Sequence, residues 1–181
     1  MSNNKVIETK ISNLLLIDTL SFSDNRGKLI KPFSINFFEN LDLNLNFKET
    51  WFTQSSKDVI RAMHMQLGTK ACEKFISVIS GSVIDVIIDL RKDSDTFLKT
   101  EYFELKGSIP QALYIPIGCA HGYKVLEDNT ITMYMATDVH DQKNDIGIRW
   151  DSFGYDWKIK KPIISERDLE LPLLQEYLNK F

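Results

Sequence analysis

The sequence predicts a single all-β domain with short helices near its C-terminus, and three observations support this fold class. Short segments rich in β-branched and aromatic residues recur between residues 75 and 135. Turn-forming residues separate them, as at 80–81, 118–119 and 127–129. Helical patterns occur only toward the two ends of the chain. Strands of this length and spacing are typical of β-sandwiches and β-barrels.

The expected elements follow in chain order. Residues 33–43 favour one short helix, and residues 59–66 alternate as a strand does. Further strands are expected at 75–79, 83–90, 102–105, 112–115, 122–126 and 130–135. The segment 83–90 is too apolar for a strand with one solvent face, which predicts a central strand.

Two short helices are expected at the C-terminal end. Ser165-Glu166-Arg167-Asp168 has the pattern of a capping box before an apolar run. Pro172 suits the first turn of a second helix, which would end at about residue 179.

Composition and charge narrow the function. The 181 residues suit one domain, residues 1–181. Its 22 basic and 25 acidic residues give a net charge of −3, which does not support a nucleic acid or a membrane as partner. The two cysteines, Cys72 and Cys119, form no CxxC pair, so we expect free thiols and no structural zinc. The N-terminal region shows no signal segment, which predicts a cytoplasmic protein.

Two of the three histidines lie in suggestive contexts. Alternation over residues 59–66 predicts that one face carries Ile60, Ala62, His64 and Gln66 and the other Arg61, Met63 and Met65. The second context is Pro116-x-Gly118-x-x-His121. These segments resemble the two motifs of the cupins, with His64-x-Gln66, Lys74 and Gly81 as the first. The resemblance implies a double-stranded β-helix, which is a jelly roll.

The chain departs from the usual cupin motif at two positions. Gln66 replaces an imidazole, and Lys74 replaces the carboxylate that would bind a metal. An ammonium group has no lone pair to donate to a cation. We therefore expect a pocket without a metal or another cofactor. A histidine and a lysine suit proton abstraction next to a carbonyl, with the lysine supporting the enolate oxygen.

A more specific resemblance extends over residues 23–175. The matching segments are Asp24-Asn25-Arg26-Gly27, Val59 to Gln66, Lys74 with Gly81 to Val86, Asp89-Leu90-Arg91, Ile115 to Tyr123, Tyr134, Gly147 to Asp151 and Ile164 to Asp168. In this order they resemble the dTDP-4-dehydrorhamnose 3,5-epimerase family of nucleotide-sugar epimerases.

This resemblance implies a role for each matching residue. His64 would be the base, paired with Asp168, and Tyr134 would be the acid on the opposite side of the sugar. Lys74 would support the enolate oxygen. The implied substrate-binding residues are Arg61, Arg26, Gln66, His121, Phe22, Asp145 and His140. Arg26 would reach in from a neighbouring subunit, because the family implies a homodimer.

The departures from the family concern the substrate. Glu49-Thr50-Trp51 replaces a Gln-Asp-Asn stretch, Asp145 replaces a glutamate, and His140 replaces an aromatic residue. Ala62 replaces a glycine. The catalytic positions are retained, which predicts a cofactor-independent epimerase of a nucleoside-diphosphate 4-keto-6-deoxy sugar. It would invert C3, C5 or both, and the altered substrate positions leave open a nucleotide sugar different from the family's.

Two other functions fit the same pattern. A related cupin isomerase would move the keto group between C4 and C3, and a non-catalytic cupin would only bind a sugar. Each residue also has a structural alternative. Asp168 would then only cap a helix, Tyr134 would be a core tyrosine, and Lys74 a solvated strand-edge lysine.

Overall fold

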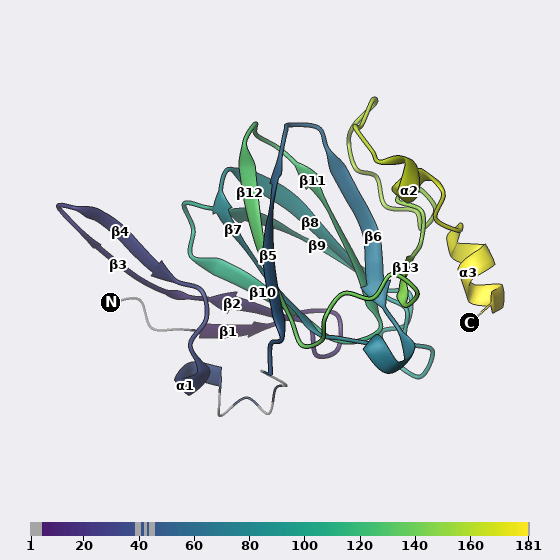
Figure 1. The fold of residues 1–181 in the computed structure, drawn as a ribbon, viewed down its shortest axis with the longest axis horizontal. Coiled ribbons are helices and arrows are strands. Elements are labelled where there is room, and N and C mark those ends of the chain that lie inside the picture. The colour runs from purple at the N-terminus through teal and green to yellow at the C-terminus, as the bar shows by residue number, and fades with distance from the viewer. Residues whose placement is uncertain (1–4, 39–40, 42, 44–45, 181) are drawn as a thin grey trace.

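The computed structural model describes every residue except 1–4, 39–40, 42, 44–45 and 181. Two antiparallel sheets pack face to face (Figure 1). In spatial order, one sheet has β1 (Lys5–Glu8), β2 (Leu15–Asp18), β10 (Gln111–Ile115), β7 (Lys74–Ser80), β12 (Thr130–Ala136) and β5 (Glu49–Ser55). The other has β13 (Asp145–Gly147), β6 (Ile60–Gln66), β11 (Cys119–Val125), β8 (Ser82–Asp89) and β9 (Thr100–Lys106). This jelly-roll sandwich confirms the predicted all-β fold.

The six strands expected between residues 75 and 135 all form. Strand β8 lies between β11 and β9 and is buried along most of its length, so the predicted central strand is confirmed. The sequence pattern did not predict β1, β2, β5, β13 or the hairpin of β3 (Leu20–Asp24) and β4 (Gly27–Lys31). That hairpin projects from the sandwich, and β4 is exposed throughout (Figure 1). Without a buried face, a strand lacks the alternation by which we identify it.

The helices are short. Helix α1 (Ile35–Phe38) lies within the expected segment 33–43, part of which is outside the described residues. Helix α2 (Glu166–Leu169) has Ser165 as its N-cap, as predicted. The expected second helix, α3 (Leu174–Lys180), also forms, but it begins two residues after Pro172, which therefore precedes its first turn. Among the described residues, no helix is long and apolar enough to cross a membrane.

The predicted alternation in β6 is wrong at its N-terminal half. His64 pairs with His121 on β11, and Arg61 pairs with Tyr123. Between these two pairs, two residues of β6 lie opposite a single residue of β11. This bulge turns Arg61 to the side of His64. Ile60 and Ala62 consequently point to the opposite side, where they pack with Met63 and Met65 in the cluster outside the five-stranded sheet.

Three apolar clusters hold the sheets in place. The central cluster joins residues of both sheets, among them Ile76 and Leu113 from one and Ile87 and Val125 from the other. The C-terminal segment covers the outer face of the five-stranded sheet with residues such as Trp157. Aromatic residues around α1 cover the other sheet. The outer faces of both sheets are thus covered by apolar residues.

Gly147 lets β13 approach β6. It pairs with His64, and a Cβ atom at this position would overlap the carbonyl oxygen of Met63. We expect Gly147→Ala to lower the free energy of unfolding by about 3 kcal/mol, at the upper end for overpacking. Urea denaturation measures this change. An unchanged midpoint would show that β13 shifts freely.

Candidate active site

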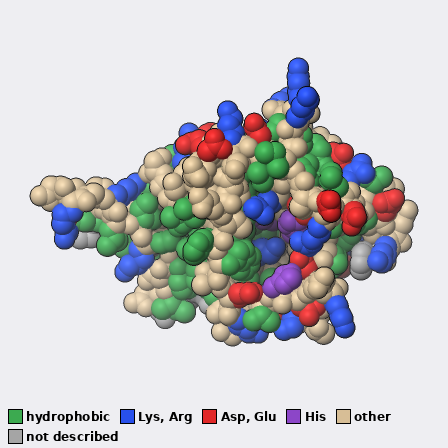
Figure 2. All heavy atoms as spheres, turned by 45° about the horizontal axis from the view of Figure 1, so that its top comes forward, with side chains coloured by type: hydrophobic (Ala, Val, Ile, Leu, Met, Phe, Trp, Pro, Cys, Tyr) green, Lys and Arg blue, Asp and Glu red, His purple; other side chains and the backbone are tan. Residues whose placement is uncertain are grey.

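The pocket opens between the two sheets and has a volume of about 420 Å³. Figure 2 shows a hollow in which basic and histidine side chains gather next to apolar ones. The lining residues are Glu49, Trp51, Thr53, Arg61, His64, Gln66, Cys72, Lys74, His121, Tyr123, Tyr134, Ala136, Asp138, His140, Asp145 and Arg167. Within the described part of the chain, no group of three or more His, Cys, Asp or Glu residues is arranged to hold a metal.

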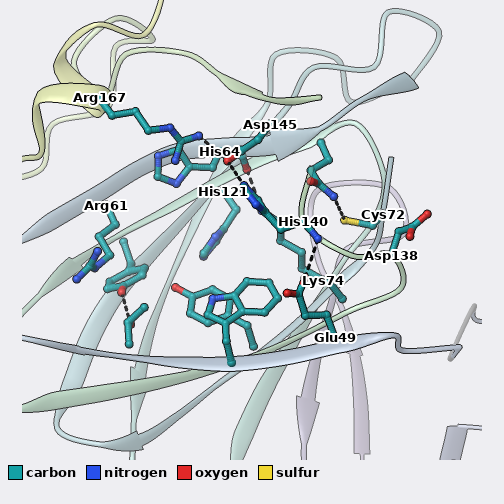
Figure 3. Close-up of a pocket in the computed structure, with 16 residues that line it drawn as sticks. Glu49, Arg61, His64, Cys72, Lys74, His121, Asp138, His140, Asp145 and Arg167 are labelled. Carbon is teal, nitrogen blue, oxygen red and sulfur yellow. Dashed lines mark hydrogen bonds and ion pairs between the residues drawn. The ribbon is translucent and has the colours of Figure 1, made fainter. Parts of the chain in front are cut away.

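The two sheets place different residue types on opposite walls (Figure 3). His64 and His121 come from β6 and β11 of the five-stranded sheet. Lys74 and Tyr134 come from β7 and β12 of the six-stranded sheet. A ligand between the walls would therefore have an imidazole on one side and a phenol on the other.

His64 is held by Asp168. Its Nε2 lies 2.8 Å from Oδ1 of this carboxylate, and the amide N–H of Ala62 donates to Oδ2 at 3.3 Å. The N-cap Ser165 accepts from the backbone N–H of Asp168. The backbone of Asp168 thus belongs to the cap, while its buried carboxylate orients the histidine. Because the carboxylate binds the proton on Nε2, Nδ1 is left to accept one.

Burial controls the ionisation of this pair. It lowers the pKa of His64, against the effect of Asp168, and the charges of Lys74 and Arg167 lower it further. For Asp168, burial opposes ionisation, but the hydrogen bonds from His64, Ala62 and Ser165 leave its pKa below the usual value. The pair at neutral pH is therefore a carboxylate and a neutral imidazole, which is the form a general base needs.

Lys74 reaches the pocket from the opposite sheet. Its ammonium donates to the backbone oxygen of His64 at 3.4 Å. Burial lowers its pKa from the usual value. A buried cation beside the base is well placed to stabilise negative charge on a bound carbonyl oxygen.

Tyr134 faces the pocket from β12 and is 6% exposed. Burial, and then its neighbour Tyr123, raise the pKa of its phenol well above 10. Its ring stacks on Trp51, with centroids 4.9 Å apart and planes 2° apart. Tyr134 therefore keeps its proton at neutral pH and can donate it.

His121 forms a second buried pair in the same pocket. Its Nε2 lies 2.9 Å from Oδ2 of Asp85, and both side chains are almost inaccessible. Burial raises the pKa of Asp85 despite the histidine. The sequence analysis assigned His121 to the pocket but assigned no role to Asp85, which lies one strand away on β8.

Gln66 lines the pocket, but its amide is committed to the protein. Nε2 donates to the carbonyl oxygens of Lys70 and Val139 at 3.0 and 3.3 Å, and Oε1 accepts from the N–H of Asp141 at 2.7 Å. These bonds join the two loops that border the pocket. Gln66 therefore supports the rim as well as facing the cavity.

Charged residues from distant segments meet at the rim. Asp145 lies 2.9 Å from Nε2 of His140 and 2.6 Å from the guanidinium of Arg167. Glu49 accepts from the N–H of His140 at 2.7 Å. Glu49 belongs to the stretch that the resemblance places near the substrate, whereas no role was predicted for Arg167. Arg167 could have been predicted as a pocket residue, because it immediately precedes Asp168 in the capping box that begins at Ser165.

The predicted arginines lie in different places. Arg61 lines the pocket, and its Nε donates to Ser55. Arg26 and Phe22 belong to the projecting hairpin, outside the residues that line the pocket. Arg26 is 83% exposed and pairs with Asp24 at 2.6 Å.

Comparisons with known proteins match this geometry to one family. The sequence profile described as dTDP-4-dehydrorhamnose 3,5-epimerase matches residues 8–176. The chain belongs to this family of epimerases. The resemblance inferred from the motifs is thereby confirmed, and so is the prediction of an isomerase.

Several relatives in this epimerase family match over nearly their whole length. The dTDP-4-dehydrorhamnose 3,5-epimerase of Escherichia coli K12 is 33% identical, over 96% of each chain. That of Shigella flexneri is 32% identical, over 91% of this chain and 92% of its own. The crystal structure of the Bacillus anthracis enzyme, with TDP and PPi bound, is 34% identical. Its TM-score is 0.91, and the match covers 95% of this chain and 100% of that one.

The ionisation of the His64–Asp168 pair predicts the pH dependence of an epimerase. We expect kcat/KM to be constant from pH 8 to 7 and to fall only below about 6.5, as His64 gains a proton. In Asp168→Asn the anion that raises the pKa of His64 is gone, so this acid limb should move to lower pH. The rate should also fall by about 10²–10⁴, because an amide can stabilise the wrong tautomer.

A matched control for this variant is Glu166→Gln, which changes an exposed acid on the same helix. Its pH profile should equal that of the wild type. A shift of the acid limb to higher pH in Asp168→Asn would contradict the pairing.

Proposed function

We propose that this epimerase inverts both C3 and C5 of a dTDP-linked 4-keto-6-deoxy sugar. The observation that carries the proposal is the opposition of His64 and Tyr134 across the pocket, on facing sheets. Inversion requires a proton to leave one face of a carbon and another to arrive on the opposite face. The thymidine nucleotide is inferred from the relatives, whose names specify dTDP sugars, and from a similar solved structure that has dTDP-4-keto-L-rhamnose bound.

The reaction follows from the charges of the pocket. Nδ1 of His64 takes the proton from the carbon next to the C4 ketone. The C–H electron pair forms the C=C bond of the enolate, and the π pair of the carbonyl moves to its oxygen. The resulting enolate is stabilised by the ammonium of Lys74. The enolate then collapses, and the carbon takes the phenol proton of Tyr134 from the opposite face. Solvent returns a proton to the phenolate and removes one from His64 before the second carbon reacts.

The diphosphate requires cations near the entrance. Arg61 lines the pocket and carries a planar guanidinium, which binds phosphate oxygens in pairs. We assign the same task to Arg26, with Phe22 beside the nucleotide, from the hairpin of a second subunit. The exposure of both residues on a projecting hairpin supports this homodimer. The free, buried thiols of Cys72 and Cys119 support a cytoplasmic enzyme.

The test is proton NMR of dTDP-4-keto-6-deoxyglucose in D₂O with the purified protein. Loss of both the H3 and H5 signals, together with a product of inverted configuration, is the expected result. Loss of one signal would limit the enzyme to one centre. A carbonyl that moves from C4 to C3 would identify a ketoisomerase, and binding without exchange across several nucleotide sugars would identify a non-catalytic protein.

A further inference from the structure

We propose that Trp51 is a positioning residue that aims the phenol of Tyr134 at the sugar. This inference rests on the proposed function of Tyr134 as the acid. The sequence pattern places Trp51 where the family carries a polar residue, so the family pattern does not assign it this role.

The contact between the two rings is built into the sheet. Trp51 and Tyr134 are directly opposite each other in the register of β5 and β12. Their rings are parallel within 2°, at a centroid distance of 4.9 Å. The hydroxyl of the preceding residue, Thr50, donates to the backbone oxygen of Tyr134 at 2.8 Å. Side chain and backbone of Tyr134 are thus both held by strand β5.

Other aromatic rings limit the remaining freedom of Tyr134. His121 meets it edge to face, with centroids 6.1 Å apart. Tyr123 lies at 6.5 Å, and its hydroxyl is bonded to Thr53 at 2.8 Å. Trp51 covers the flat face of the phenol ring, so its removal would allow the ring of Tyr134 to rotate toward the space that the indole occupied.

This constraint matters for only one half of the reaction. Deprotonation depends on His64 and Lys74. Among the described residues, Trp51 forms no hydrogen bond with either of them. Proton return depends on the direction of the phenol, because a misplacement of about 1 Å can lower a rate about 100-fold. When the phenol is misaimed, the enolate is reprotonated by His64 on the original face. Where His64 has first exchanged its proton with D₂O, the carbon then gains deuterium without inversion.

The experiment measures deuterium exchange and inversion together, by NMR of the dTDP sugar in D₂O. We expect Trp51→Ala to exchange within about threefold of the wild type, while the ratio of inversion to exchange falls at least about tenfold. Trp51→Leu retains much of the volume without a flat ring and should show the same change. Trp51→Phe restores a stacked ring and should restore the ratio.

The matched control is Phe52→Ala. Phe52 is the next residue of β5, points to the other side and is 74% exposed, so its removal should leave the ratio unchanged. An equal fall of exchange and inversion in both Trp51→Ala and Trp51→Leu would overturn the inference, because Trp51 would then act on binding or folding. An unchanged ratio would overturn it too. A wild-type protein that exchanges no proton from any nucleotide sugar would instead remove the proposed function itself.

Discussion

Replacing His64 with alanine is expected to lower proton exchange at both C3 and C5 by at least about 10³-fold. General-base catalysis contributes about 10²–10⁴ in enzymes, and no enolate forms without removal of the proton. The effect should be equal at the two centres, since we propose that the His64–Asp168 pair, on one wall of the pocket, serves both. NMR in D₂O measures each rate separately.

This experiment also distinguishes His64 from the second buried histidine–carboxylate pair of the pocket, His121 with Asp85. If exchange at one centre survives in His64→Ala, His121 with Asp85 would be the base for that carbon. Partial recovery of exchange with added imidazole would show that only the base is missing. Thermal unfolding at the wild-type temperature would establish that the variant is folded.

Replacing Tyr134 with phenylalanine is expected to separate exchange from inversion. The ring still stacks on Trp51, so the fold and the opposite wall are retained. His64 continues to remove protons, but no acid returns them from the other face. Inversion should fall by about 10²–10³, with exchange reduced much less.

Tyr102→Phe is the matched control, because this tyrosine is 62% exposed on β9, away from the pocket residues. It should invert at the wild-type rate. Equal losses of exchange and inversion in Tyr134→Phe would show that the phenol takes part in forming the enolate, and not only in returning the proton.

Much of the fold follows from local pattern. The six strands from β7 to β12 were predicted because their apolar and β-branched residues are grouped between turn signals. The capping box of α2 was predicted because a cap depends on residues three positions apart. The projecting hairpin was missed because neither of its strands has a buried face.

The candidate site was predicted in part. His64, Lys74, Tyr134, Gln66 and His121 were named from motifs, and the structure brings all five to one pocket. The side of the strand on which Arg61 lies was predicted wrongly. A bulge depends on how β6 pairs with β11, about 60 residues later in the chain, and regular alternation contains no sign of it.

The sequence by itself therefore determined the fold class, the family and the residues that we propose to handle protons. The pairing of His64 with Asp168 was already implied by the family resemblance, and only the tertiary structure decided two other partners: Asp85 behind His121, and Trp51 against Tyr134. These pairs join residues far apart in sequence. Their contacts depend on strand register and on the packing of two sheets, whereas motifs and periodicity report only on neighbours along the chain.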